Sequence, residues 1–169
     1  GILFHIGAFI GIVFSLHTRD RTQHVAALAY AGSALGAVFA GDLLTLFVFW
    51  ELLAVSSVFL IFASRTERSF GAGMRYLVIQ VISGVLLLAG ALILYGQSGS
   101  LRFEHIGLTG AGSMLIFIAF GIKCAFPLLH NWLTDAYPEA TPTGTVFLSA
   151  FTTKVAVYAL ARGFAGTEV

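Results

Sequence analysis

The sequence predicts an all-α fold, a polytopic transmembrane helix bundle of about six segments with one discontinuous helix. Hydrophobic residues make up 58% of the 169 residues and charged residues only 10%, with a mean hydropathy of +0.93, which is too apolar for an ordinary water-soluble domain. The apolar residues form long runs separated by polar turns. The chain also has 19 glycines, and small residues let helices approach closely in lipid.

Six apolar segments are visible, and about 20 residues are needed to cross about 30 Å of hydrocarbon. They cover residues 2–16, 25–40, 43–63, 76–95, 113–126 and 143–161. We therefore expect one transmembrane domain over residues 1–169, multi-pass in the cell (inner) membrane. The chain enters the first segment without an initiator methionine, so we expect it to be a fragment of a longer protein.

The polar connections define how consecutive segments meet. Residues 17–24 form a polar turn after the first segment, and Gly41-Asp42 is a very short turn that makes the second and third segments antiparallel neighbours. We expect Asp42 to be the N-cap of the third segment. Residues 64–75 separate the third and fourth segments, and the Gly/Ser-rich stretch 96–112 leads to the fifth.

Basic residues predict the orientation, because they favour the cytoplasmic side. If the six segments cross in alternation, five arginines fall on one side and two on the other; they are Arg19, Arg21, Arg65, Arg68 and Arg75 against Arg102 and Arg162. We expect the first group in the cytoplasm and the N-terminus outside.

Three charged residues lie inside apolar segments, namely Glu51 in the third, Lys123 in the fifth and Lys154 in the sixth. A lysine at membrane depth costs about 3 kcal/mol on insertion scales, so such residues indicate a functional use of charge. Glu51 and Lys123 are natural partners across helices, since an uncompensated charge in lipid is prohibitive. Two structural alternatives stay open: a neutral Glu51 that only packs, and a Lys154 that snorkels to an interface.

Pro127 follows Lys123 by four residues. A proline in a helix removes the bond to the carbonyl four residues earlier, which here belongs to Lys123 itself. The helix is therefore predicted to open at residues 125–128. Accessory relay members could be His130, Asp135 and Tyr158, although a solvated loop explains His130 and Asp135 equally well.

Several function classes are disfavoured. The chain has no P-loop, dinucleotide-binding glycine pattern, HExxH or GxSxG motif, so no catalytic chemistry of its own is predicted. Cys124 is the single cysteine, no zinc or haem spacing exists, and we expect neither cofactor nor metal. The formal net charge of +1 argues against nucleic acid as a partner.

Two stretches carry a resemblance to a known family: FWELLAVSSVFLI at residues 49–61 and GIKCAFPLLHNWLTDAYPEATPTGTVFLSAFTTKVAVYALAR at residues 121–162. They resemble the antiporter-like subunits of Mrp-type cation/proton antiporters, respiratory complex I and membrane-bound hydrogenases, the D-type Mrp subunit above all. The resemblance covers nearly the whole chain. It implies one half of an inverted-repeat transporter, with a first repeat at about 25–163 preceded by one extra helix.

The resemblance also implies roles for the three charges. Glu51 matches the family's glutamate on the second helix of the repeat, Lys123 the lysine at the break of the discontinuous fourth helix, and Lys154 the lysine on the fifth. Three departures are visible: FPLLHNWLTDA has an extra residue and Thr134 for a proline, ATPTG replaces APTP, and Leu148-Ser149 stand where many members carry a histidine. Water or hydroxyl groups would have to bridge the path from Lys123 to Lys154.

Three functions follow as hypotheses. The first is a proton-translocating subunit of a multisubunit cation/proton (Na⁺/H⁺) antiporter with a Glu51, Lys123 and Lys154 relay. The second is a proton-pumping membrane subunit of a complex I-like NADH:quinone oxidoreductase or hydrogenase, part of a redox-driven translocase. The third is a structural membrane subunit. The expected partners are lipid, other membrane subunits of the same hetero-oligomeric complex, protons and Na⁺.

Overall fold

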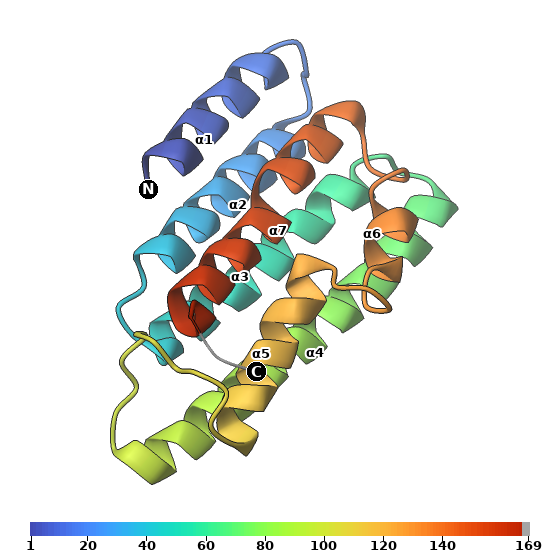
Figure 1. The fold of residues 1–169 in the computed structure, drawn as a ribbon. Helices are drawn as coiled ribbons and strands as arrows, with labels where there is room; N and C mark the ends of the chain where they lie inside the picture. Colours follow the sequence, from blue (N-terminus) through green and yellow to red (C-terminus); the bar gives the residue numbers. More distant parts are fainter. Residues whose placement is uncertain (167–169) are drawn as a thin grey trace.

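The computed structural model describes residues 1–166, and over that range it is a bundle of α-helices (Figure 1). In chain order the helices are α1 (Ile2–Ser15), α2 (Arg21–Phe39), α3 (Leu43–Phe62), α4 (Glu67–Ser98), α5 (Ala111–Cys124), α6 (Asn131–Ala136) and α7 (Pro142–Phe164). Within the described residues, α3, α4 and α7 are long and apolar enough to cross a membrane, and α1 and α5 are shorter apolar helices. The predicted all-α membrane bundle with one interrupted helix is confirmed. The last three residues of the predicted domain lie outside the described part.

Side-chain caps fix where the helices begin. Asp42 caps α3 as predicted, because its carboxylate accepts a hydrogen bond from the Thr45 amide at 2.7 Å. Helix α4 begins at Glu67, well before the predicted start at residue 76. The reason is a reciprocal capping box, in which Thr66 and Ser69 each accept the other's backbone N–H at 2.9 and 3.1 Å. The polar residues before position 76 therefore extend a helix.

Helix α3 lies at the centre of the bundle, where it packs against α2, α4 and α7. Helix α1 lies at one edge against α2 and α7, and α4 lies at the opposite edge with α5 and the short α6 against it (Figure 1). Chain neighbours thus pack side by side, as the short turns predict. The order places the third, fourth and fifth helices of the described chain around a shared interior.

The connections gather at two opposite ends of the bundle. At one end three ion pairs join the α1–α2, α3–α4 and α5–α7 connections and their adjoining helix ends: Arg65–Asp20, Arg68–Glu139 and Arg75–Asp135. At the other end, backbone hydrogen bonds of 2.8 and 3.0 Å join residues 41–43 to residues 101–103. The connections thus alternate between the two ends of the bundle, and Arg65, Arg68 and Arg75 lie at the end opposite to Arg102, as the sequence predicts.

Candidate functional site

Lys123 is fully buried, with 0% of its surface exposed, near the C-terminal end of α5. Its Nζ donates a hydrogen bond to the backbone carbonyl of Trp50 at 3.1 Å and lies 4.7 Å from the centroid of the Trp50 ring. A carbonyl oxygen and an aromatic face both attract a cation where water is excluded. The structure therefore places the lysine in a site built to hold its charge.

Glu51, on α3, lies beside this site and interacts electrostatically with Lys123, although the two side chains form no direct ion pair. Its Oε1 is buried and has no hydrogen-bonding partner among residues 1–166. That oxygen lies against α4 at Gly84, where any Cβ would overlap it. Gly84 thus makes room for the carboxyl group. Glu51 and Lys123, which the sequence predicts to be partners, therefore lie near each other without forming a contact ion pair.

A three-helix hydrogen-bonded frame holds the site. The indole Nε1 of Trp50 donates to Ser83 Oγ at 3.0 Å, and Ser83 Oγ donates to the carbonyl of Ala119 at 2.7 Å. These bonds join α3, α4 and α5, and the Trp50 ring packs on Phe120 with centroids 5.1 Å apart. Trp50, which could have been a simple packing residue, therefore positions the carbonyl that receives Lys123.

The interruption of the fifth helix begins directly after Lys123 and Cys124. Ala125 adopts a left-handed conformation with φ of +61°, and the amide of Phe126 donates to the carbonyl of Gly121 at 3.0 Å, which is a helix-ending geometry usually given to glycine. Pro127 follows two residues later and has no N–H to extend the helix. The carbonyl of Ile122 accepts two hydrogen bonds here, from the amide of Ala125 at 3.1 Å and from the indole of Trp132 on α6 at 2.9 Å.

A buried cluster of hydroxyl groups lies between α2, α3, α4, α7 and the C-terminal end of α6. Tyr30 accepts the backbone N–H of Thr152 at 2.8 Å and is hydrogen-bonded to its side chain. Tyr76 is hydrogen-bonded to Ser57 at 2.7 Å and also interacts with Thr152. Tyr137 donates to the carbonyl of Leu148 at 2.9 Å. Hydroxyl groups thus surround the part of α7 where the sequence lacks the histidine.

The structure does not bring Lys154 to the other two charges. Lys154 is exposed, contacts Thr153 at 3.2 Å and lines a groove between α1 and α7. Thr152 faces the buried hydroxyl cluster, and Lys154 lies two residues later on the same helix. Two residues turn the direction of a side chain by about 200°, so Lys154 points to the opposite side of α7. The Nζ lies within electrostatic range of Cys124, the residue after Lys123. Tyr158 contacts Arg162 at 3.5 Å.

The remaining accessory candidates lie at the end of the bundle. His130 precedes α6 and is exposed. Asp135 accepts two hydrogen bonds from Arg75, at 2.7 and 2.9 Å, which lower the pKa of its carboxyl. Neither residue approaches Lys123 in the hydrogen-bond network of residues 1–166. No group of three or more potential metal ligands occurs in the described chain.

Comparison with known proteins places this chain in a family. A family model described as NADH:quinone oxidoreductase/Mrp antiporter, TM, matches residues 40–167. The chain belongs to this family. NADH-quinone oxidoreductase subunit N of Desulforudis audaxviator is 38% identical over 145 residues, covering 80% of this chain and 28% of the relative. The D-type Na⁺/H⁺ antiporter subunit of Bacillus subtilis is 27% identical over 175 residues, covering 93% and 36%.

A solved relative has the same arrangement of helices. A chain of the Mrp complex from Dietzia sp. DQ12-45-1b superimposes with a TM-score of 0.74 at 29% identity, over 80% of this chain and 27% of that chain. The sequence thus spans between about a quarter and two fifths of the lengths of these antiporter-family relatives. The family resemblance predicted from the sequence and the transmembrane class are both confirmed.

Sequence reasoning missed three α4 residues that face this site: Gln80, Ser83 and Gly84. All three are buried, and they lie on the face that meets α3 and α5. A signal was present, because Gln80 lies four residues after Tyr76 and three and four residues before Ser83 and Gly84, which puts all of them on one side of a helix within an apolar segment. A polar stripe of this kind in a membrane helix indicates a functional face.

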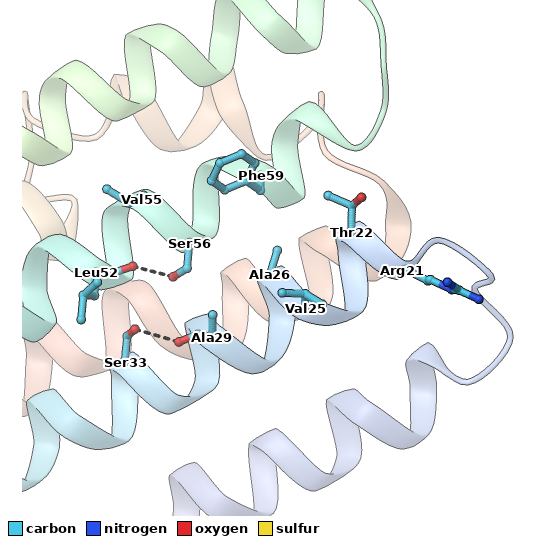
Figure 2. Close-up of a pocket in the computed structure, with 10 residues that line it drawn as sticks. All are labelled: Arg21, Thr22, Val25, Ala26, Ala29, Ser33, Leu52, Val55, Ser56 and Phe59. Carbon is cyan, nitrogen blue, oxygen red and sulfur yellow. Dashed lines mark hydrogen bonds between the residues drawn. The ribbon is translucent and has the colours of Figure 1, made fainter.

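The apolar groove between α2 and α3 is separate from this site (Figure 2). Its volume is about 540 Å³, and neither Glu51 nor Lys123 is among its lining residues. Its two serines are satisfied within their own helices, since Ser33 donates to the carbonyl of Ala29 and Ser56 to that of Leu52, as Figure 2 shows. The groove therefore offers an almost wholly apolar lining.

Proposed function

We propose that this chain is the first-repeat half, at about residues 25–163 with α1 as an extra helix, of a proton-translocating subunit of a multisubunit cation/proton (Na⁺/H⁺) antiporter. One observation carries the proposal: Lys123 is fully buried beside Glu51 at the point where a helix is interrupted. Ionisable groups at membrane depth mark ion pathways, and interrupted helices commonly form coupling-ion sites in transporters.

In this proposal Glu51 and Lys123 exchange protons near the middle of the membrane. A proton that reaches Glu51 removes its negative charge, which weakens the retention of the Lys123 proton because the two groups interact electrostatically. Lys123 can then release its proton. Lys154 would act as the outer member of the relay through its exposed face, which is free to meet a neighbouring segment of the complete protein.

A redox-driven pump is the second candidate function. The 38% identity to subunit N of an NADH-quinone oxidoreductase favours it. In that case the same half-channel works within a complex whose other subunits handle electrons. Purification of the native complex separates the two: copurifying iron–sulfur and flavin subunits indicate a pump, and only further membrane subunits indicate an antiporter.

The test of proton translocation is Glu51→Gln in the full-length protein within its assembly. The amide is nearly isosteric and cannot carry a proton, so the variant should assemble normally and lose pH-gradient-dependent transport in everted vesicles. Glu67→Gln is the matched control, because Glu67 is an exposed residue in the first turn of α4. Wild-type transport by Glu51→Gln would remove the glutamate from the mechanism and leave Glu51 a structural role.

A further inference from the structure

Gln80, on α4, is a fully buried polar side chain with unsatisfied hydrogen-bonding groups. Its exposure is 0%, and neither Oε1 nor Nε2 has a hydrogen-bonding partner among residues 1–166. Buried amides almost always have partners, either in the protein or in ordered water, because an unpaired buried amide is costly. Hydrophobic packing alone would therefore not favour Gln80 at this interior position of an apolar helix.

The only other unpartnered buried side-chain oxygen in the described chain is Glu51 Oε1. It lies against α4 at Gly84, four residues after Gln80. Positions four apart on a helix are neighbours on one face, with Cβ atoms about 5–6 Å apart. Gln80 is thus the next side chain along α4 from the Glu51 carboxyl group.

One turn in the other direction, α4 carries Tyr76. Its buried hydroxyl group is hydrogen-bonded to Ser57 Oγ at 2.7 Å and interacts with Thr152 in the hydroxyl cluster. Tyr76, Gln80 and Gly84 therefore form one stripe at intervals of four residues. Gln80 lies at the middle of this stripe, between the hydroxyl cluster and the Glu51 carboxyl group.

We propose that Gln80 binds ordered water that links the Glu51 carboxyl group to the Tyr76 hydroxyl group, which makes Gln80 a positioning residue for the proton path. One water with two hydrogen bonds of about 2.8 Å spans about one helical turn. Gly84 and Tyr76 are two turns apart on α4, so the link is a short chain of waters, and Gln80, midway, holds its central part. The amide offers a donor and an acceptor to water and keeps its own protons. The role of Gln80 in transport rests on the proposed function, whereas the binding of water at Gln80 does not.

Proton transfer through the site conserves all atoms. A proton that enters the water chain from the Tyr76 side is balanced when each water passes one of its own protons to the next and the last water gives one to the Glu51 carboxylate. The waters are regenerated, and Gln80 only orients them. Replacement of Gln80 by an apolar residue of similar length therefore removes the amide that holds the water and introduces no new polar group, while Glu51 Oε1 loses its water partner.

The experiment combines a structure of the full-length protein in its complex, at a resolution that shows ordered waters, with transport in everted vesicles. Wild type should show water density within hydrogen-bonding distance of both the Gln80 amide and the Glu51 carboxyl. Gln80→Met should assemble, lose that density and lower transport by about tenfold or more, since small misplacements along a reaction path are costly. Gln80→Glu, which keeps a donor and an acceptor when protonated, should retain the density and transport faster than Gln80→Met.

Gln23→Met is the matched control, because Gln23 is a buried glutamine whose carbonyl accepts a hydrogen bond from Thr141 at 2.7 Å. It should lower thermal stability while transport per assembled complex stays near wild type, the reverse of Gln80→Met. A direct bond between the Gln80 amide and the Glu51 carboxyl without water, or equal transport by Gln80→Met and wild type, would overturn the proposal. If the wild-type complex moves no protons, the proposed function fails, and the density still decides the water site.

Discussion

Lys123 shows how a charge is held in an apolar interior by groups that are individually weak. It is the only fully buried Lys, Arg, Asp or Glu in the described chain. The compensation comes from one backbone carbonyl, one aromatic face and the field of Glu51, not from a contact ion pair. A buried ion pair in direct contact would hold the charge more strongly, and the relay proposed above requires that Lys123 can also release its proton.

We predict that Lys123→Arg in the full-length protein assembles and still loses proton transport as completely as Lys123→Ala. Guanidinium stays protonated in proteins, so the variant keeps a positive charge but cannot release a proton. Proton flux in everted vesicles measures the effect. Arg102→Lys is the control, because Arg102 is exposed and its side chain forms a single ion pair within residues 1–166, with Glu104. The exchange of arginine for lysine there should leave proton flux unchanged. Near-normal flux in Lys123→Arg would show that Lys123 supplies a fixed charge, and the relay would run through Lys154 and water.

At the scale of helices, the ends of α5 and α6 set the geometry of the site. Ala125 and Leu128 both adopt positive φ, at +61° and +72°, which costs a non-glycine residue about 1–2 kcal/mol each. Trp132 ties α6 back to the carbonyl of Ile122. Pro127 alone predicted the break, but the helix already ends at Cys124. The proline prevents the helix from resuming, and the turn at Ala125 ends it.

The Arg75–Asp135 pair attaches α6 to the first turns of α4 and provides a pH-dependent contact. The two hydrogen bonds from Arg75 lower the pKa of Asp135 below its ordinary value of 3.8. A lowered native pKa stabilises the fold above the unfolded pKa, and this stabilisation is lost as the pH falls through the native value. Both side chains are substantially exposed, so the contribution is limited to about 1 kcal/mol or less.

We therefore predict that Asp135→Asn lowers thermal stability slightly at neutral pH and that wild type and variant converge as the pH falls below the lowered pKa of Asp135. Thermal unfolding of the purified protein in detergent, measured from pH 7 downwards, tests this. Glu104→Gln serves as a control, because its contact with Arg102 is long, at 3.7 Å, and both side chains are exposed. A difference that stays constant down to strongly acid pH would mean that Asp135 acts through its shape instead of its charge.

The sequence predicted the three charged residues inside apolar segments because charge stands out in such segments. It could not predict that Lys154 faces outwards, because the buried face of α7 depends on which helices pack against it. Gln80 was missed for the opposite reason, since an uncharged glutamine hardly interrupts an apolar run. The early start of α4 was also missed, because Arg68 and Arg75 suit either a loop or a helix that extends into water.

At the scale of the whole molecule, the bundle has two distinct ends, and the alternation of its connections defines a topology. The end with the three ion pairs contains Arg68. The opposite end contains Ser100, two residues before Arg102, whose backbone forms a β-bridge with that of Asp42. Helix α4 separates them with 32 residues, a length of about 48 Å at 1.5 Å per residue. That length exceeds the hydrocarbon thickness of about 30 Å, so both residues lie in or near the aqueous phase.

We predict that Arg68→Cys and Ser100→Cys are labelled from opposite sides of the membrane. The arginine distribution places position 100 outside, so an impermeant maleimide added to intact cells should label Ser100→Cys, while Arg68→Cys should react only after permeabilisation or in everted vesicles. Both variants are made in a Cys124→Ala background, because Cys124 is partly exposed and is the single native cysteine of this sequence. The background alone should remain unlabelled on either side. Labelling of both positions from one side would mean that α4 does not cross the membrane, and reversed sides would mean that the bundle is inserted in the opposite orientation.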